Sequence, residues 1–362
     1  MIDIQTPLKQ PIFISGLPKS GTSMFKTLLD SHPEIFMFPA NEFELFYYSH
    51  HKSMMLGKLA YERDLNKLKE LIITNEFITR LNNPESEALK SYKRDTINIP
   101  AFQEEVRAQN PKNYSELTAL IYKAMAKNSS YFDGNIDQVR YASKCVLTNE
   151  FFPELLSWFP DLKFVEVLRN PYGHFNAVRN SARKGAKYEG EKITSKHKYP
   201  VLGEIIRCMN QSYYNMEKWK ELYPNNFYVI VYDRILEDPE KELNKLSEFI
   251  GVKFDPSMLN PTVGGEKFGG NSWYVENYDK IDKRPLTHWK GKISPLEIRL
   301  VNHFFEEIIK KYGFEYLESN APLWKKMGSS EDLRTYIGNR ILFKAKGWFG
   351  YPSDEVQNFK KG

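Results

Sequence analysis

The sequence contains very little cysteine, with only Cys145 and Cys208 among 362 residues. The two do not form a Cys-X-X-Cys pair, and no group of histidines stands near them. This spacing predicts neither a disulfide framework nor a zinc site. We therefore expect both cysteines to be reduced thiols in the core.

A long hydrophobic segment is also missing. No apolar run reaches the roughly 18 residues that a membrane-spanning helix needs. The first ten residues have neither the positively charged start nor the apolar stretch of a signal peptide. These absences predict no transmembrane segment and a cytoplasmic location.

Neither sign of charge is in large excess. The chain has 51 Lys and Arg against 46 Asp and Glu, a net charge of +5, which is too small to predict nucleic-acid binding. It leaves room for a local basic pocket that holds an anionic ligand. Hydrophobic residues make up 41% of the chain and aromatic residues 14%, which suffices for a large globular core.

Three short runs of β-branched and aromatic residues predict buried strands, at 11–15, 162–168 and 227–232. Helical patterns lie between them, for example at 150–159 and 204–222. Strands that alternate with helices predict an α/β fold in which helices flank a central parallel sheet on both faces.

Two segments differ in composition from this pattern. Residues 43–130 are polar and helix-prone, which predicts a helical insertion after the first βα unit. The insertion is either a lid over the acceptor or a decoration without a role in binding. Residues 322–362 mix basic and aromatic residues, so this C-terminal tail either touches a membrane surface or a glycan, or packs on its own domain.

A glycine-rich turn directly follows the first predicted strand, with the sequence Gly16-Leu17-Pro18-Lys19-Ser20-Gly21-Thr22-Ser23. A loop between a strand and a helix can hold a phosphate with its backbone N–H groups and the positive end of the helix. A nucleoside-triphosphate loop would carry lysine directly after the second glycine, and then Ser or Thr for magnesium. That position is Thr22, and the lysine is Lys19 inside the loop. The loop therefore argues against a kinase or ATPase and predicts a metal-free anion site.

Four segments between Ile12 and Ile298 carry a family resemblance. In chain order they are Pro18–Ser23 with Leu28–Ile35, Phe159–Pro171, Val231–Pro239 with Phe249–Gly251, and Leu286–Ile293. Together they resemble the sulfotransferases that use 3′-phosphoadenosine 5′-phosphosulfate (PAPS), nearest the protein-tyrosine and carbohydrate branches. The resemblance implies a P-loop-like central sheet, a single sulfotransferase domain over 1–321, and transfer of a sulfuryl group from the co-substrate PAPS to an acceptor hydroxyl.

In-line transfer needs a base for the acceptor proton and cations for the reacting oxygens. Glu42 matches the family glutamate that serves as general base, with Glu44 as an in-register competitor and a solvated loop carboxylate as the alternative. Lys144 stands 25 residues before Arg169 and resembles the family lysine that stabilises charge on the transferring group. Its alternative is a surface lysine at a strand end. The predicted catalytic residues are Glu42, Lys19 and Lys144.

The resemblance also implies a donor site. It assigns Arg169 to the 3′-phosphate and Ser272, which lies in a Gly-rich turn, to the 5′ end. An incidental serine in a flexible turn is the alternative for Ser272. The predicted donor-binding residues are Lys19, Ser20, Gly21, Thr22, Ser23, Arg169, Ser181, Tyr232 and Ser272.

The chain departs from the family pattern in two places. Many members carry a serine eight residues after the arginine, where this chain has Ala177. Ser181 lies one helical turn further on the same face and is favoured as its substitute, with Asn176 and Asn180 as alternatives. His288 replaces a lysine of the tyrosine-sulfating enzymes. It either donates a hydrogen bond to an anion or packs in the core.

The predicted partner is a hydroxyl-bearing acceptor, and a carbohydrate or glycan precursor is preferred over tyrosine or a small phenol or alcohol. No nucleic acid is expected, and membrane contact is expected only through the C-terminal tail. A phosphate-loop kinase and an inactive nucleotide-binding homologue are the competing functions, the second because of Ala177.

Overall fold

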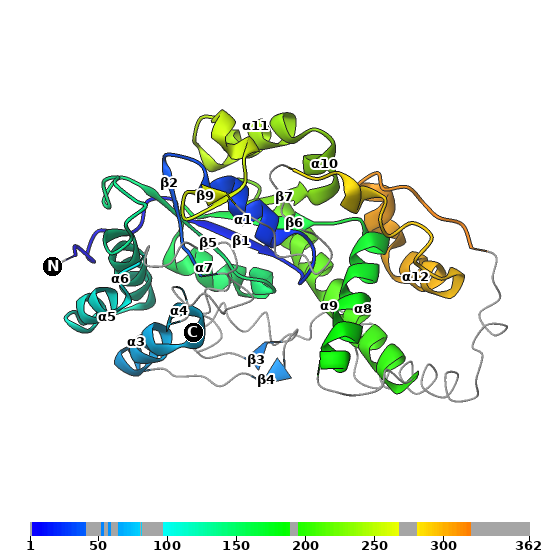
Figure 1. The fold of residues 1–362 in the computed structure, drawn as a ribbon, viewed down its shortest axis with the longest axis horizontal. Helices are drawn as coiled ribbons and strands as arrows, with labels where there is room; N and C mark the ends of the chain where they lie inside the picture. Colours follow the sequence, from blue (N-terminus) through cyan, green and yellow to red (C-terminus); the bar gives the residue numbers. More distant parts are fainter. Residues whose placement is uncertain are drawn as a thin grey trace. The chain divides into compact units, whose positions relative to one another are not determined.

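Figure 1 shows a computed structural model of the chain, coloured along the sequence. The structure describes residues 2–40, 52–53, 57–58, 64–79, 81, 97–188, 195–267 and 281–319. The chain divides into two compact units, residues 1–168 with 219–283 and residues 169–218 with 284–362. The single domain predicted over 1–321 spans parts of both units and stays a prediction.

The first unit contains every strand that the structure describes. Its elements are β1 (Ile12–Gly16), α1 (Thr22–Asp30), β2 (Ile35–Met37), β3 (Lys52–Ser53), β4 (Gly57–Lys58), α3 (Leu65–Thr74), α4 (Glu76–Thr79), α5 (Ile99–Arg107), α6 (Tyr114–Lys127), β5 (Arg140–Lys144), η2 (Thr148–Phe151), α7 (Phe152–Trp158), β6 (Lys163–Leu168), β7 (Phe227–Val231), α10 (Tyr232–Glu237), α11 (Pro239–Ile250), η3 (Pro256–Leu259), β8 (Thr262–Val263) and β9 (Glu266–Lys267).

The core of this unit is a five-stranded sheet with the order β2-β5-β1-β6-β7. Every neighbouring pair in it is parallel. The predicted α/β fold with a central parallel sheet and flanking helices is therefore confirmed. The three predicted strands correspond to β1, β6 and β7, but β7 ends at Val231 because Tyr232 already begins α10.

Different helices cover the two faces of the sheet (Figure 1). On one face, Phe164 of β6 and Phe227 of β7 stack at 5.0 Å, and Phe152 of α7 meets Phe227 edge-on at 5.1 Å. On the other face, Tyr228 of β7 stacks on Phe249 of α11 at 5.0 Å. Because successive strand residues point to opposite faces, Phe227 and Tyr228 identify the two layers. Strands of a parallel sheet that is covered on both faces have continuous apolar sequences, and the sequences of β6 and β7 are of this kind.

The described part of the predicted insertion is helical, with α3, α4, α5 and α6 at 65–127. Buried lysines anchor it through backbone carbonyls. Lys69 of α3 donates to the carbonyl of Gln109 at 2.7 Å, and Lys123 of α6 donates to the carbonyl of Asp3 at 2.7 Å. These bonds fix the helices to each other and to the N-terminal segment. A role of the insertion as a lid over the acceptor stays a prediction.

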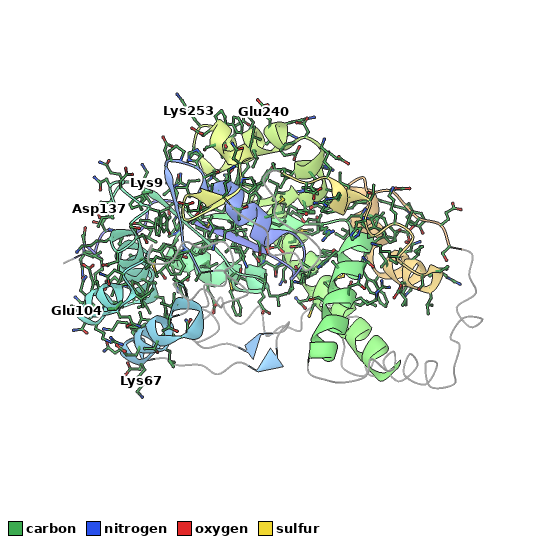
Figure 2. All side chains as sticks on the ribbon, in the orientation of Figure 1. Lys9, Lys67, Glu104, Asp137, Glu240 and Lys253 are labelled. Atoms are coloured by element: carbon green, nitrogen blue, oxygen red, sulfur yellow. The ribbon has the colours of Figure 1, made fainter. Side chains whose placement is uncertain are left out.

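Most charged side chains of this unit lie on its surface. Figure 2 labels six of them, which all project outward and are exposed: Lys9, Lys67, Glu104, Asp137, Glu240 and Lys253. Four lysines of the described residues are instead buried, namely Lys26, Lys69, Lys123 and Lys144. A buried ammonium group needs partners that replace water. These four lysines therefore have either a structural role or a role in the chemistry of the site.

The second unit is helical in its described part. Its elements are α8 (Pro171–Tyr188), α9 (Ser195–Leu222), whose last four residues belong to the first unit, η4 (Arg284–Leu286) and α12 (Pro295–Lys311). Arg179 of α8 and Glu297 of α12 form a buried ion pair at 2.5 Å. Tyr172 of α8 stacks on Trp289 at 5.7 Å. The segment that contains Trp289 therefore packs against the beginning of α8.

Candidate functional site

The carboxyl end of β1 is the expected place for a ligand. β1 is the central strand, and the chain leaves it toward β2 on one side before it returns through β5 to β6 on the other. In open α/β sheets, ligands bind outside the carboxyl ends of the strands where the strand order reverses. The loops that follow β1, β5 and β7 meet at this edge.

The predicted phosphate loop is built on a tight turn. The N–H of Ser20 donates to the carbonyl of Leu17 at 3.0 Å, with Pro18 second in the turn and Lys19 third. Lys19 has a φ of 70°, as the third residue of a type II turn requires. An L residue there costs about 1 kcal/mol. The turn leaves Lys19 exposed at the edge of the loop.

A tyrosine from a distant part of the chain covers the second glycine of the loop. Gly21 has a φ of 106°, and a Cβ atom on it would lie 2.2 Å from Cδ2 of Tyr232. Tyr232 is the first residue of α10 and is buried. The structure thus brings together Gly21 and Tyr232, which the sequence assigned to the same site.

The loop contains a buried polar atom without a partner. Ser20 is 1% exposed, and its Oγ has no hydrogen-bond partner among the described residues. The next residues begin α1, whose first N–H groups have no acceptor within the helix. An unpartnered hydroxyl, helix-end N–H groups and Lys19 fit an anion such as the phosphate or sulfate part of PAPS.

Lys144 lies at the carboxyl end of β5 and is 1% exposed. The alternative of a surface lysine is therefore wrong. Its Cα is paired with that of Ile14 in β1, so both side chains point to the same face of the sheet.

The chain after Lys144 is held against the start of the phosphate loop. The N–H of Leu147 donates to the carbonyl of Gly16 at 3.0 Å, and the N–H of Thr148 donates to Oγ of Ser15 at 3.2 Å. Leu147 has a φ of 62°, a conformation that costs an L residue about 1 kcal/mol. The two hydrogen bonds therefore join the two loops at this edge of the sheet.

The residues predicted to bind the 3′-phosphate belong to the second unit. Arg169 directly follows β6, begins the second unit and is half-buried. Ser181 lies on α8 and is half-buried. The alternative Asn176 accepts hydrogen bonds on Oδ1 from Arg179 at 2.6 Å and Asn180 at 3.3 Å. That amide oxygen is committed within the helix.

Several predictions lie outside the described residues, namely Glu42, Glu44, Ser272 and the C-terminal tail at 322–362. Cys145 is a buried thiol as expected, whereas Cys208 is half-buried. His288 is exposed, so it is not a packed core histidine. Its role toward an anion stays a prediction.

Comparison with known proteins decides the family. A model of the Sulfotransferase family matches residues 11–256 of this chain. The chain belongs to the sulfotransferase family. The match contains the phosphate loop, Lys144, Arg169 and Tyr232, and it identifies the protein as a transferase.

The chain is also similar to individual proteins. The solved sulfotransferase domain from the curacin biosynthetic pathway is 19% identical with a TM-score of 0.51 and covers 86% of this chain and 100% of that domain. This likeness shows the fold. A "Putative protein-tyrosine sulfotransferase" of Caenorhabditis briggsae is 18% identical over 288 residues, which are 78% of this chain and 81% of that protein. An uncharacterized protein of Aquifex aeolicus is 22% identical over 259 residues, 70% of this chain but 27% of that relative's length.

Motif reasoning missed two charged residues of this sulfotransferase on α1, the helix that follows the phosphate loop. Lys26 and Asp30 lie one turn apart on α1, and Lys26 is 1% exposed. Their neighbours Phe25, Leu28 and Leu29 are all completely buried. The signal was present in the sequence as a lysine and an aspartate four residues apart within an apolar helix pattern.

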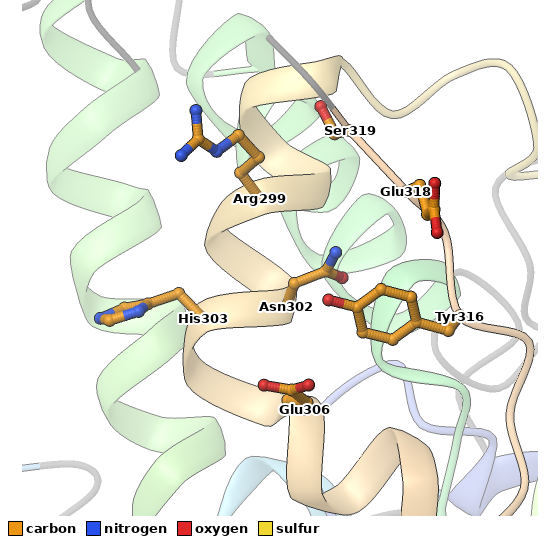
Figure 3. Close-up of a pocket in the computed structure, with 7 residues that line it drawn as sticks. All are labelled: Arg299, Asn302, His303, Glu306, Tyr316, Glu318 and Ser319. Atoms are coloured by element: carbon orange, nitrogen blue, oxygen red, sulfur yellow. The ribbon is translucent and has the colours of Figure 1, made fainter. Parts of the chain in front are cut away.

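A separate hollow lies in the second unit of the sulfotransferase (Figure 3). It has a volume of about 460 Å³ and is lined by polar side chains of α12 and the segment after it, namely Arg299, Asn302, His303, Glu306, Tyr316, Glu318 and Ser319. None of the predicted site residues lines it. The structure therefore gives no reason to place the donor there.

Metal-ligand clusters and membrane-spanning helices are absent from the described ranges. These ranges contain no group of three or more His, Cys, Asp or Glu residues placed to hold a metal ion. Within the same ranges, no helix is both long and apolar enough to cross a bilayer.

Proposed function

We propose that this sulfotransferase moves a sulfuryl group from PAPS to a hydroxyl of its acceptor. The observation that carries the proposal is the phosphate loop, where the buried Oγ of Ser20 has no partner among the described residues and Lys19 is exposed in the turn. Thr22 occupies the position where a triphosphate loop needs lysine. The loop therefore suits an anion whose recognition needs no magnesium.

Bound PAPS supplies the sulfuryl group and a phosphate leaving group. Lys19 donates a hydrogen bond to the bridging oxygen, where charge develops as the bond to sulfur breaks. Lys144 approaches the same edge from β5 and stabilises negative charge on the transferring oxygens. Glu42 takes the proton of the acceptor hydroxyl. Each group acts where charge appears or disappears during transfer.

Further residues are proposed to hold the donor. Arg169 pairs with the 3′-phosphate, because a guanidinium fork matches phosphate geometry, and Ser181 on α8 assists it in place of the serine missing at Ala177. Ser272 binds near the 5′ end. Tyr232 closes the loop at Gly21 and shapes its anion-facing backbone, which is supported by the 2.2 Å clash that a Cβ added to Gly21 would make.

A carbohydrate or glycan-precursor hydroxyl is our first acceptor. Tyrosine is the second candidate, because a relative that covers 78% of this chain is described as a protein-tyrosine sulfotransferase. The exposed histidine at position 288, where tyrosine-sulfating enzymes carry lysine, favours the first. A small phenol or alcohol belongs to the same chemistry.

Calorimetric titration with 3′,5′-diphosphoadenosine (PAP), the product of the donor, tests the proposal. We expect PAP to bind tightly in the presence of EDTA and magnesium-ATP to bind weakly. Stronger binding of magnesium-ATP would contradict the proposal and favour a kinase. PAP binding without turnover in a screen of glycans, tyrosine peptides and phenols would identify an inactive homologue.

A further inference from the structure

The helix that follows the phosphate loop carries two side chains of opposite charge, one buried and one half-buried. Lys26 and Asp30 are four residues apart on α1, the spacing that puts two side chains on the same face of a helix. Lys26 is 1% exposed and Asp30 is half-buried. Each side chain is hydrogen-bonded to a segment outside the helix.

Lys26 holds the chain that follows β2. Its Nζ donates to the carbonyl of Pro39 at 2.5 Å and to that of Ala40 at 3.1 Å. The N–H of Phe38 donates to the carbonyl of Ala142 at 2.7 Å, so this segment continues along β5. Both carbonyls bound by Lys26 come immediately before the chain that reaches Glu42, two residues after Ala40.

Asp30 holds the β8–β9 hairpin. Its Oδ2 accepts hydrogen bonds from Oγ1 of Thr262 at 2.8 Å and from the N–H of Gly265 at 3.2 Å. Gly264 and Gly265 have φ values of 59° and 75°, the conformation of a tight hairpin turn with both central residues left-handed. The chain that leaves this hairpin at Lys267 reaches Ser272 five residues later.

The position of Asp30 is electrostatically unfavourable without these partners. It ends α1, where the helix dipole disfavours negative charge. Burial raises the pKa of Asp30 above its ordinary value, and the hydrogen bond from Thr262 and the charge of Lys26 offset only part of that rise. Lys26 therefore supplies positive charge that favours the ionised form of the Asp30 carboxyl group.

A buried charge pair is not needed for stability alone, because well-packed apolar residues often stabilise a protein equally well. Here Lys26 and Asp30 form hydrogen bonds with segments outside α1. In the sequence, these segments lead to the proposed base and to the proposed donor serine. We propose that Lys26 and Asp30 are positioning residues that brace these two segments against the helix of the phosphate loop. The proposal rests on the function proposed above.

The two halves of the brace predict different defects. Lys26→Met should raise amide exchange at 36–40 about tenfold, because a charge-assisted hydrogen bond is lost there, and should leave PAP affinity within about threefold. Asp30→Asn should raise exchange at 262–267 to a similar degree and weaken PAP binding about tenfold. Thr262→Val removes the hairpin side of the same bond and should resemble Asp30→Asn.

The experiment combines hydrogen–deuterium exchange with PAP titration of the full chain. Lys26→Arg keeps the charge and should restore protection at 36–40. Lys67→Met and Glu104→Gln, which change exposed residues of the helical insertion (Figure 2), are matched controls and should alter neither measurement. If Lys26→Met or Asp30→Asn does not fold, Lys26→Arg and Thr262→Val still report on each half.

The outcomes separate this inference from the proposed function. Unchanged exchange at both segments, or exchange raised uniformly over the sheet, would overturn the brace. Local exchange changes with unaltered PAP affinity in Asp30→Asn and Thr262→Val would overturn the positioning role. A wild-type protein that does not bind PAP would overturn the proposed function, while the exchange data would still decide whether the brace exists.

Discussion

Gly21 shows how one residue depends on a side chain more than 200 positions away. Its φ is 106°, and the Tyr232 ring lies 2.2 Å from the position that an added Cβ would take, so a larger residue meets both backbone strain and steric conflict. Gly21→Ala should therefore lower the free energy of unfolding by about 2–4 kcal/mol and weaken PAP binding. Urea denaturation and calorimetry measure the two effects.

Gly313→Ala is the matched control for this substitution. Gly313 also has a positive φ, 70°, but an added Cβ would meet nothing within 4 Å. It should show only the backbone cost of about 1 kcal/mol and normal PAP affinity. Equal destabilisation by both variants would mean that the Tyr232 ring moves aside without cost.

Glu42 is the proposed base, and its removal should separate chemistry from binding. Glu42→Ala should lower turnover roughly 100-fold or more, because general-base catalysis contributes that much, and should leave PAP affinity within a few-fold. Glu44→Ala is the control for the in-register competitor. Loss of PAP binding in Glu42→Ala would show that Glu42 is structural, and a larger turnover defect in Glu44→Ala would transfer the role to Glu44.

Arg169 is proposed to recognise one phosphate of the donor. Arg169→Ala should weaken binding of 3′,5′-diphosphoadenosine by about 10- to 100-fold, since a bidentate charge-assisted contact is lost. Binding of adenosine 5′-monophosphate, which lacks the 3′-phosphate, should hardly change. Calorimetric titration with both nucleotides measures the difference. Equal weakening of both would remove Arg169 from the 3′-phosphate site.

At the scale of residues, the sequence predicts best where backbone geometry and chemistry coincide. Lys19 and Gly21 could be proposed as site residues because a strand, a glycine turn and a helix follow one another directly in the sequence. Lys26 and Asp30 could not, because their partners Ala40 and Thr262 come together only in the folded chain. A charged residue within an apolar helix pattern indicates that its side chain is buried, but the pattern does not predict which group it will bind.

At the scale of elements, α8 and α12 depend on the Arg179–Glu297 pair, whose side chains are 7% and 2% exposed. Burial raises the pKa of Glu297, but hydrogen bonds from Arg179 and Ser294 outweigh it and hold the pKa below 4.5. A lowered folded pKa means that the stabilisation is complete above the unfolded value near 4.5. It is lost as the pH falls through the folded value.

Glu297→Gln tests this pair. At pH 7 it should cost about 3–5 kcal/mol, because Arg179 is left buried without its counter-charge, and the difference from wild type should shrink as the pH falls below 4.5. Urea denaturation across that range is the measurement. Glu306→Gln breaks the exposed pair with Lys310 and should have a much smaller effect. A cost of Glu297→Gln that does not depend on pH would show that the ion pair is not its cause.

The sequence predicts a strand where it contains a continuous hydrophobic run. It does not predict a polar strand that is buried only because it lies between other strands of the sheet. β6 and β7 were recognisable from their own residues. β5 has the sequence Arg-Tyr-Ala-Ser-Lys but is fully buried, because it lies between β1 and β2 in the sheet. Its polar residues are satisfied by tertiary partners, as when Arg140 donates to the carbonyl of Ile250 at 2.8 Å. No local sequence pattern predicts such a strand.

At the scale of the whole molecule, a ligand that binds only the folded chain must raise its stability. If PAP is the natural product, PAP at 100 times its dissociation constant should stabilise the protein by about 2.7 kcal/mol. That corresponds to a rise of a few degrees in the midpoint of thermal unfolding. EDTA should not reduce the shift, because Thr22 occupies the position that lysine takes in magnesium-dependent loops.

The same melting experiment identifies which part of the molecule receives the ligand. Lys19→Met removes the exposed charge from the phosphate-loop turn and should abolish most of the PAP-induced shift while leaving the melting temperature without PAP nearly unchanged. Arg299→Met changes the separate hollow on α12 (Figure 3) and should keep the full shift. The opposite pattern would move the nucleotide away from the phosphate loop. If magnesium-ATP raised the melting temperature more than PAP did, the phosphate loop would remain the binding site but its ligand would be ATP instead of PAPS.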